Sequence, residues 1–297
     1  MATAVTDGLP VLVYIHDGGF ESRRTSKYPP ETIVLGLTEP MIFVTMEYCL
    51  GQFGFLPGTA VNDNGVLSAG LLDQKAALLW VQKYINQFGG NPNNVTIWGQ
   101  SAGAGSVVYH LIGNRGTNTG LFNQVMGDST PFFYLPNYND TFPENLFAMF
   151  ANLAWRVRQP VNERGYDDLS AWGINEGLGD RDTVELDIEP NAEQYYPLVD
   201  YQGSLSLQGQ QMHGEMRYIC SVVMIASIGY AAGLPTYQYQ WDNPSLSSTH
   251  SAELVAFFNN DSVVFNSADT QLVAAMTGYW MSFVTSGMPT SSTAAIS

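Results

Sequence analysis

The chain has 297 residues, enough to bury a sizeable core in one large α/β domain or two ordinary ones. It carries 11 lysines and arginines against 27 aspartates and glutamates, and the resulting net charge of -16 would repel nucleic-acid phosphates and anionic membranes. No apolar run approaches the ~18 residues of a membrane-spanning helix, and the first ten residues, MATAVTDGLP, do not resemble a secretory signal. We therefore expect no nucleic-acid partner, no integral membrane segment and no signal peptide. Composition assigns neither a cellular location nor an oligomeric state.

The two cysteines, Cys49 and Cys220, lie far apart and show no CxxC or Cys/His ligand spacing. That arrangement predicts neither a metal site nor a disulfide scaffold. One bridge between them is possible in principle, but lone cysteines are commonly buried. We therefore expect two buried thiols.

The first half of the chain alternates short apolar runs with longer helical patterns, which is typical of parallel strands joined by crossover helices. Apolar runs predict strands, and apolar residues at helical spacing predict helices that end at turn formers. The predicted strands are 11–15, 41–46, 95–98 and 124–126, and the predicted helices are 71–88 and 102–111. This pattern favours an α/β fold with a mostly parallel central sheet and helices on both faces.

The second half is less regular. A loop is predicted at 137–140, a helix at 144–155, and a short apolar run at 169–174 inside a polar, acidic stretch. Order returns with a helix at 212–231, a strand at 236–241, a serine-rich loop and a final helix at 270–285. We expect one domain over residues 1–297, with an irregular or helical insertion at about 137–210.

A glycine-flanked serine lies between a predicted strand and a predicted helix, in the sequence Gly-Gln-Ser101-Ala-Gly. Such glycines permit a sharp, strained turn that exposes a serine hydroxyl as a nucleophile. An ordinary crossover turn is the alternative. A phosphate-binding turn is disfavoured, because Val108 occupies the last position of G-x-G-x-x-G after Gly103 and Gly105, and no Walker-type lysine follows.

A serine nucleophile needs a base, and the chain has four histidines. His16 follows the first strand, His110 lies in the helix after Ser101, and His213 begins an apolar helix. His250 lies in a late loop beyond the predicted strand 236–241, which matches the chain order nucleophile, acid, histidine. We expect His250 to be the base; a solvated loop histidine is the alternative.

The segment His-Asp-Gly18-Gly19-Phe follows the first predicted strand. A glycine pair at a strand end can offer exposed backbone N–H groups to a developing oxyanion. Together with the N–H of Ala102, those of Gly18 and Gly19 would form a three-donor oxyanion hole. The alternative is a tight turn that needs small residues.

These motifs resemble the type B carboxylesterase family, which includes cholinesterases and fungal lipases, and fungal members are the most similar. The resemblance covers about half the chain, in the following segments: LPVLVYIHDGGF, VTMEYCLGQFGFL, GLLDQKAALLWVQKYINQFGGNPNNVTIWGQSAGAGSV, THSAEL and MTGYWMSFVTSGMP. It implies an α/β-hydrolase fold, the nucleophile Ser101, the base His250 and no metal or cofactor.

Several positions depart from the family pattern. Asp17 replaces the first glycine of a Gly-Gly-Gly run and would place a carboxylate beside the oxyanion hole. Cys49 replaces a customary arginine, and Gln100 replaces the commoner glutamate. Relative to the family, the first strands with their disulfide loop are absent and the middle is short, which predicts a truncated or mis-spliced product.

The acid that would orient the histidine falls in the short middle. Glu176 stands in Gly-Ile-Asn-Glu-Gly, which resembles the family's G-x-N-x-E-G shortened by one residue. Glu163 is the second candidate, and a missing acid is the third possibility. The acid would stabilise the imidazolium without taking its proton.

The sequence thus predicts a serine hydrolase that cleaves carboxylic esters through an acyl-enzyme, with small lipophilic esters as substrates. Some aromatic residues, such as Phe20 and the run 132–134, are candidates for an apolar pocket. The first alternative is a catalytically inactive binding relative or a truncated fragment. The second is a nucleotide-binding α/β protein.

Overall fold

The computed structural model describes residues 8–35, 40–56, 58–112, 120–131, 194–259 and 263–290. The chain divides into two compact units, one formed by residues 1–144 together with 235–297, and the other by residues 145–234. The predicted loop at 137–140, the helix at 144–155, the apolar run at 169–174 and most of the expected insertion lie outside the described residues.

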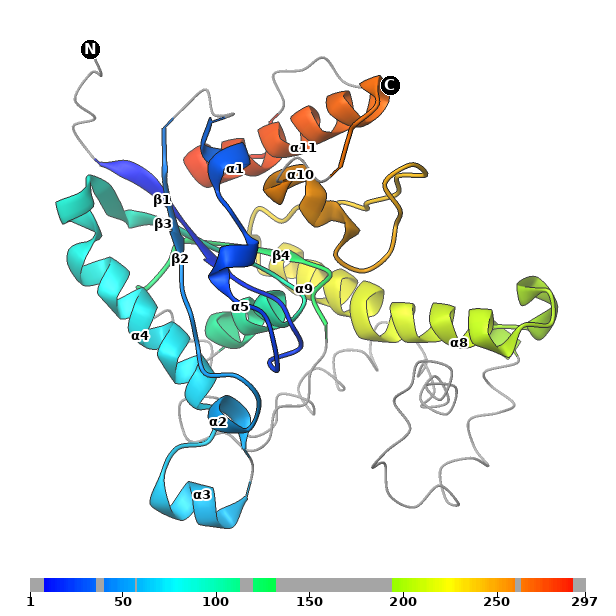
Figure 1. Cartoon of the computed structure of the whole chain (residues 1–297), viewed down its shortest axis with the longest axis horizontal. Coiled ribbons are helices and arrows are strands. Elements are labelled where there is room, and N and C mark those ends of the chain that lie inside the picture. Colours follow the sequence, from blue (N-terminus) through cyan, green and yellow to red (C-terminus); the bar gives the residue numbers. More distant parts are fainter. Residues whose placement is uncertain are drawn as a thin grey trace. The chain divides into compact units, whose positions relative to one another are not determined.

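The first unit contains a sheet of four parallel strands in the order β2-β1-β3-β4 (Figure 1). The strands are β1 (Leu9–Ile15), β2 (Ile42–Thr45), β3 (Gly90–Gln100) and β4 (Gln124–Asp128). All four strands predicted in the first half are confirmed, although β3 begins five residues before the predicted start. Because the strands are parallel, the residues that follow β1, β3 and β4 meet at one edge of the sheet.

Helices join and cover these strands. They are α1 (Glu31–Leu35), α2 (Gly51–Phe55), α3 (Thr59–Asn64), α4 (Ala69–Tyr84), α5 (Ala102–Ile112), α10 (Val255–Phe258) and α11 (Ser267–Ser286). Short 3-10 turns lie at Thr25–Lys27, Ile85–Phe88 and Ala252–Leu254. The predicted helices 102–111 and 270–285 are confirmed within three residues at each end, and the predicted helix 71–88 corresponds to α4 together with the 3-10 turn at Ile85–Phe88.

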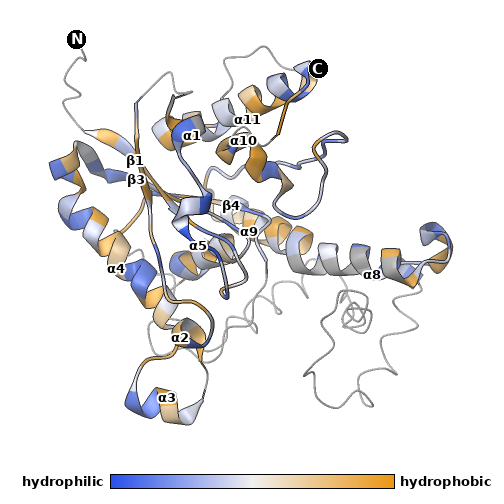
Figure 2. Ribbon diagram, viewed as in Figure 1, coloured by the Kyte–Doolittle hydropathy of each residue, from blue (hydrophilic) through white to orange (hydrophobic). Residues whose placement is uncertain are grey.

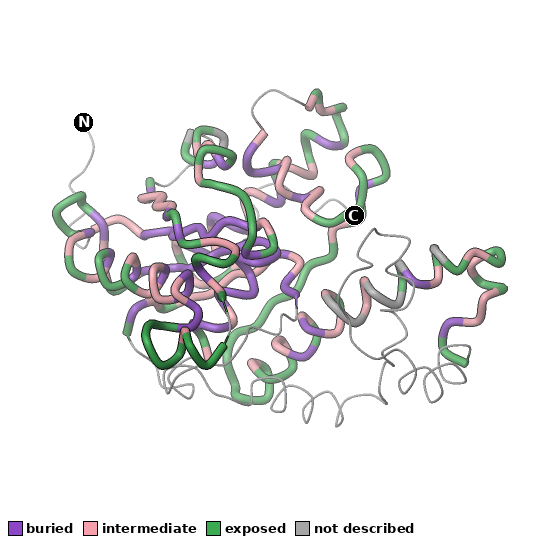
Figure 3. The backbone as a smooth tube through the Cα atoms, turned by 60° about the horizontal axis from the view of Figure 1, so that its bottom comes forward, coloured by how far each residue is buried: buried purple, intermediate pink, exposed green. Residues whose placement is uncertain are grey.

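Alternation along the strands sends side chains to two different layers of helices. Leu12, Tyr14 and Trp98 pack with residues of α10 and α11, and the rings of Trp98 and Phe257 lie 5.0 Å apart in an edge-on arrangement. On the other face, Val11 lies near Ile85, which follows α4. Figure 2 shows the apolar colouring of β1 and β3, and Figure 3 colours the chain by burial. Residues 11–15 of β1 and 95–100 of β3 are buried, whereas β2 and most of β4 are half-buried. Both faces are therefore covered, as expected for a parallel sheet.

The predicted strand at 236–241 is wrong, because the segment forms no strand of the described sheet. Its side chains attach it to the core instead. The ring of Tyr239 stacks edge-on against Trp280 at 4.6 Å, and the indole N–H of Trp241 donates to the carbonyl oxygen of Ser247 at 2.8 Å. The alternating aromatic residues of this segment thus attach it to the core through their side chains, and the segment does not pair with a strand of the described sheet.

The described part of the second unit is mainly helical. It contains a 3-10 turn at Leu198–Tyr201, α8 (Leu205–Gly214), a π-helical turn at Glu215–Ile219 and α9 (Cys220–Ala231). The predicted helix at 212–231 is confirmed but begins seven residues earlier, because the glutamine-rich α8 has no apolar periodicity that would reveal it. Among the described residues, no helix is both long and apolar enough to cross a membrane.

The expectation of two buried thiols is wrong for Cys49, which is exposed, whereas Cys220 is half-buried; no disulfide joins them. The backbone of Cys49, and not its side chain, is the packed part. Its N–H donates to a carboxylate oxygen of Asp73 at 2.9 Å, and its carbonyl oxygen lies 2.0 and 2.4 Å from where a Cβ on Gly54 or Gly70 would be. The thiol is left facing solvent.

Candidate active site

Ser101 forms a sharp turn between β3 and α5. Its φ of 53° lies in the left-handed region that non-glycine residues rarely adopt. The turn is held on both sides, because the Ser101 N–H donates to the carbonyl oxygen of Asp128 at 3.0 Å and its own carbonyl accepts from the N–H of Gly105 at 2.8 Å. A strained residue fixed in this way at the end of a parallel strand is typical of a nucleophile elbow.

The two glycines that flank Ser101 are required by close backbone contacts. A Cβ on Gly99 would lie 2.3 Å from the carbonyl carbon of Gly103. A Cβ on Gly103 would lie 1.9 Å from the carbonyl oxygen of Ile15, at the end of β1. The Gly-x-Ser-x-Gly pattern therefore lets α5 press directly on β3 and β1.

His250 is the histidine that contacts this serine. Its Nε2 lies 2.8 Å from the Ser101 Oγ, which is hydrogen-bond distance. Ser101 itself is 7% exposed, whereas His250 is an exposed residue. The sequence-predicted nucleophile and base, 149 positions apart, are thus brought together in the first unit.

The loop that carries His250 is tied to the start of α11. Asp269 accepts hydrogen bonds from the side chains of Asn243 at 3.0 Å and Ser245 at 2.6 Å. The same Asp269 forms a reciprocal capping box with Asn266, which caps the first turn of α11. One helix cap therefore also fixes the loop before the histidine.

The other described histidine side chains have different partners. His16 is buried, and its Nδ1 donates to the carbonyl oxygen of Asp17 at 2.9 Å. His110 lies in α5 with its Nε2 3.0 Å from the side-chain oxygen of Gln74. Burial lowers the pKa of His110 to about 4, so this imidazole is neutral at physiological pH.

The predicted oxyanion loop turns sharply after β1. Gly18 and Gly19 have φ angles of 104° and 65°, which glycine adopts without strain. Within the described part of the chain, no hydrogen bond uses the N–H groups of Gly18, Gly19 or Ala102. The close approach of Ile15 to Gly103 holds the strand end that leads into this loop against the start of α5.

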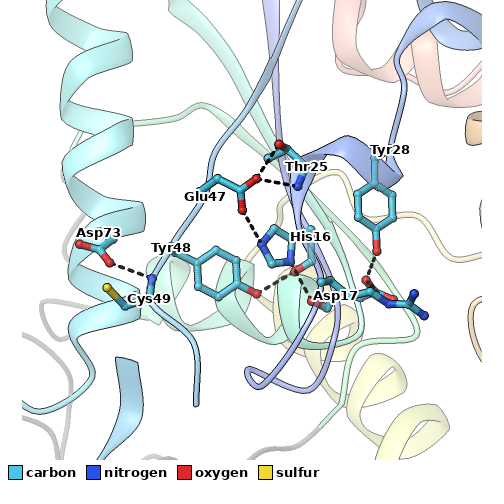
Figure 4. A network of polar contacts seen from close by, with 9 residues as sticks. His16, Asp17, Thr25, Tyr28, Glu47, Tyr48, Cys49 and Asp73 are labelled. Carbon is cyan, nitrogen blue, oxygen red and sulfur yellow. Dashed lines mark hydrogen bonds and ion pairs between the residues drawn. The ribbon is translucent and has the colours of Figure 1, made fainter. Parts of the chain in front are cut away.

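Asp17 is buried just before the two glycines, but its charge is countered (Figure 4). Its Oδ1 accepts a hydrogen bond from the hydroxyl of Tyr28 and lies 3.6 Å from the Nε of Arg23. Burial and the Asp17 carboxylate raise the pKa of Tyr28, so the phenol stays protonated as a donor. Asp17, which replaces a glycine of the family pattern, therefore anchors the loop through Tyr28 and Arg23.

A second set of contacts in Figure 4 fixes the same loop from the segment that follows β2. The Tyr48 hydroxyl donates to the carbonyl oxygen of His16 at 2.9 Å. Glu47 accepts from the backbone N–H and the hydroxyl of Thr25 at 2.9 and 2.7 Å, and its other oxygen lies 3.7 Å from the His16 Nε2. The loop therefore has side-chain supports on both sides.

Sequence reasoning missed two buried acids near Ser101. Asp128, at the end of β4, is 1% exposed, and Glu253, three residues after His250, is 3% exposed. The available signals were an acid at the end of a short strand and another directly before the apolar stretch 254–258. Burial raises the pKa of the Glu253 carboxyl. The side chain of Gln100, which is also fully buried, lowers the same pKa by a smaller amount.

The acid candidates Glu176 and Glu163 lie outside the described residues, as do the aromatic residues 132–134. Phe20 is described and is a buried packing residue, with its ring 4.7 Å from that of Phe55. Among the described residues, no cluster of three histidine, cysteine, aspartate or glutamate side chains is arranged to hold a metal ion.

A parallel sheet with a serine elbow and a histidine from a late loop defines the α/β-hydrolase fold. Two solved structures agree: Aspergillus niger EstA has a TM-score of 0.69 at 22% identity over 98% of this chain and 74% of its own. A PNB esterase has a TM-score of 0.68 at 22% identity over 98% of this chain and 75% of its own. At such identity the likeness concerns the fold alone.

The sequence itself matches the profile of the carboxylesterase family over residues 2–163 and 174–296. The chain therefore belongs to the carboxylesterase family. Lipase 1 of Geotrichum candidum is 34% identical over 209 residues, covering 66% of this chain and 34% of that lipase. Lipase 2 of Diutina rugosa is 42% identical over 120 residues, covering 39% of this chain and 22% of that lipase. The match thus spans about a third or less of the length of these curated relatives.

Proposed function

We propose that this chain hydrolyses carboxylic esters through a covalent acyl-serine intermediate. The observation that carries the proposal is the 2.8 Å contact between the Ser101 Oγ and the His250 Nε2 at a strained strand-to-helix turn. A serine hydroxyl is a weak nucleophile unless an adjacent base accepts its proton. Membership of the carboxylesterase family supports the same chemistry.

In the first half of the reaction, the Ser101 Oγ attacks the ester carbonyl carbon while its proton moves to the His250 Nε2. The imidazolium then gives that proton to the alcohol oxygen as the ester C–O bond breaks, leaving an acyl-serine. In the second half, His250 takes a proton from water, which attacks the acyl carbon. Collapse of that intermediate returns the proton to Ser101 and releases the acid.

The N–H groups of Gly18, Gly19 and Ala102 would hold the negative oxygen that forms in both halves. The positive φ angles of the two glycines and the unused N–H groups support this role. Glu176 is the proposed acid for the imidazolium on the basis of its sequence motif, with Glu163 as the alternative. Small lipophilic esters are the proposed substrates, and the reaction needs no metal or cofactor.

The test is to expose the protein to a reactive organophosphonate and map the adduct by intact mass and peptide analysis. We expect one adduct, on Ser101, together with hydrolysis of a short-chain p-nitrophenyl ester. Ser101→Ala should abolish the adduct and lower kcat by about 10⁴-fold or more. Ser227→Ala, which removes an exposed serine in the second unit, is the matched control and should do neither.

A cooperatively melting protein that takes up no phosphonate and hydrolyses no ester would overturn the proposal. It would instead indicate an inactive binding relative. A broad, non-cooperative melt without labelling would indicate a chain that does not assemble the site. Stabilisation by nucleotides together with indifference to phosphonate would indicate a nucleotide-binding protein.

A further inference from the structure

A buried carboxyl lies beneath the proposed nucleophile and has no role in the mechanism above. Asp128 ends β4, and its backbone carbonyl accepts the N–H of Ser101. Its side chain is almost completely inaccessible. Acidic side chains are rarely buried without a reason, since removal of a charge from water is costly unless hydrogen bonds or proton uptake compensate.

The Asp128 carboxyl joins two segments that approach the site from different directions. One oxygen accepts from the indole N–H of Trp98 at 2.7 Å, three residues before Ser101 on β3. The other accepts from the hydroxyl of Tyr239 at 3.0 Å, in the segment that leads to the His250 loop. A single side chain therefore ties the strand that carries Ser101 to the segment that precedes His250.

A second buried carboxyl continues this connection beyond the histidine. Glu253 follows His250 by three residues, and its Oε1 accepts from the hydroxyl of Ser129 at 3.4 Å. Ser129 is the next residue after Asp128 and has a φ of 47°, another strained position at the same sheet edge. His250 is thus flanked on both sides by attachments to the end of β4.

The Glu253 carboxylate acts on Asp128 within this buried layer. Burial and then the Glu253 carboxylate raise the pKa of Asp128 well above its usual value, and burial is the largest cause of the raised pKa of Glu253. Within the described residues, no ion pair joins either acid to a lysine or arginine. Asp128 therefore retains its proton at pH values where an isolated aspartic acid has lost it.

Other titratable groups face this pair from several elements. Tyr239 lies beside both acids, and Tyr14 of β1 is coupled to both. Burial raises the pKa of each phenol, so both stay neutral over the working range. Asp17 faces Glu253 and raises its pKa further, although Arg23 counters part of that charge. The surroundings therefore favour the neutral form of Asp128.

We propose that Asp128 is a positioning residue for the Ser101–His250 pair, and that it acts by tying Trp98, on the strand that carries Ser101, to Tyr239, in the segment that leads to His250. This inference rests on the proposed function, because it concerns the geometry of the same reaction. Loss of the Asp128 proton adds a negative charge to the buried layer that also holds the Glu253 carboxylate, and the repulsion loosens both attachments of the histidine segment. The catalytic contact then weakens at alkaline pH without loss of substrate binding.

The test compares Asp128→Ala with Asp128→Asn in the full chain, using kcat, KM and their pH profiles on a short-chain p-nitrophenyl ester. Asp128→Ala removes both ties and should lower kcat about tenfold or more while KM stays within about twofold, because small displacements of reacting groups are costly. Asp128→Asn can accept from Trp98 and donate to the Tyr239 oxygen. It should restore most of kcat and move the alkaline decline to higher pH, because it carries no titrating proton.

Asp63→Asn, on exposed α3, is the matched control and should leave the profile unchanged. If Asp128→Ala does not fold, Tyr239→Phe removes one tie and should still lower kcat several-fold at constant KM. The inference is overturned if Asp128→Ala or Tyr239→Phe keeps the parent kcat, or if the profile of Asp128→Asn superimposes on that of the parent. A parent chain that neither hydrolyses the ester nor labels on Ser101 contradicts the proposed function instead.

Discussion

Two segments meet at the site and are held there by different means. The serine arm, residues 90–112, comprises β3, the elbow and α5, and most of it is buried. The histidine arm, the described residues of 235–269, is largely irregular and exposed outside α10, and side-chain hydrogen bonds to α11, β4 and itself hold it. Backbone packing fixes the first arm, whereas polar contacts between distant residues, together with the packing of α10 in the core, fix the second.

This difference predicts different responses to substitution. Disruptive substitutions in the serine arm should lower the stability of the whole first unit, because β3 lies inside the sheet and α5 packs directly on two of its strands. Damage to the histidine arm should change local order and activity more than global stability. The following predictions separate the two responses.

The largest expected effect comes from Gly103→Ala in the serine arm. The new Cβ would lie 1.9 Å from the carbonyl oxygen of Ile15, and backbone on both sides leaves no flexible side chain to move aside. We expect a loss of about 3 kcal/mol or more in the free energy of unfolding, measured by urea denaturation.

Gly214→Ala is the matched control. Gly214 is helical, and nothing lies within 4 Å of the position its Cβ would take. That substitution should leave stability unchanged or raise it by about 0.5–1 kcal/mol. If both variants lose the same free energy of unfolding, the close packing of Gly103 in α5 against Ile15 in β1 does not determine stability.

The next effect is a pH dependence that originates in the serine arm. The pKa of His110 falls from 6.5 to about 4 on burial in α5. A lowered folded pKa means that stability is present above pH 6.5 and is lost as the pH falls through about 4, because protons bind the unfolded chain more readily. The full shift corresponds to about 3 kcal/mol, at 1.36 kcal/mol per unit.

Urea denaturation at pH 7 and pH 4 should therefore show a smaller acid loss in His110→Gln than in the parent chain. The comparison between variants isolates this histidine from the other groups that titrate in the same range. Glutamine is a matched replacement because it can still hydrogen-bond to Gln74. Identical acid losses in the two proteins would rule out His110 as a source of acid sensitivity.

The smallest effect is expected in the histidine arm, from Asn266→Ala. The substitution removes the cap of α11, whose side chain accepts from the N–H of Asp269 at 2.9 Å, and should cost about 1 kcal/mol. Because Asp269 also holds Asn243 and Ser245, ester hydrolysis should fall more than stability does. Asn266→Ser retains a capping oxygen and should recover both quantities. A loss of stability with full activity would show that the cap does not support the loop.

The same contrast explains what the sequence could predict. In the serine arm, strand, turn and helix follow one another in the sequence. The glycines at 99 and 103 directly indicate positions where the backbones come into close contact. Local pattern was therefore enough to predict β3, α5 and the sharp turn at Ser101 between them. The three-donor oxyanion hole remains a prediction that the loop geometry supports.

The histidine arm depends on contacts that no local pattern records. The sequence pattern predicts that Tyr239 lies in a strand, whereas its side chain attaches to Asp128, more than a hundred residues earlier in the chain. The Asn266–Asp269 capping box has a recognisable spacing but was not predicted, since its second function is to hold Asn243 and Ser245. His250 is predicted as the base from two signals, its position in the chain order and the family resemblance.

The outward-facing thiol of Cys49 gives the molecule a natural attachment point for a fluorophore. Cys220 lies in the other compact unit, so a donor and an acceptor dye on the two cysteines would span both units without any engineered residue. The Asp73 carboxylate, which interacts with the Cys49 side chain as well as its backbone, raises the pKa of the thiol, and mildly alkaline buffer will therefore speed its labelling. Energy transfer between the dyes would report the distance between the two units in solution.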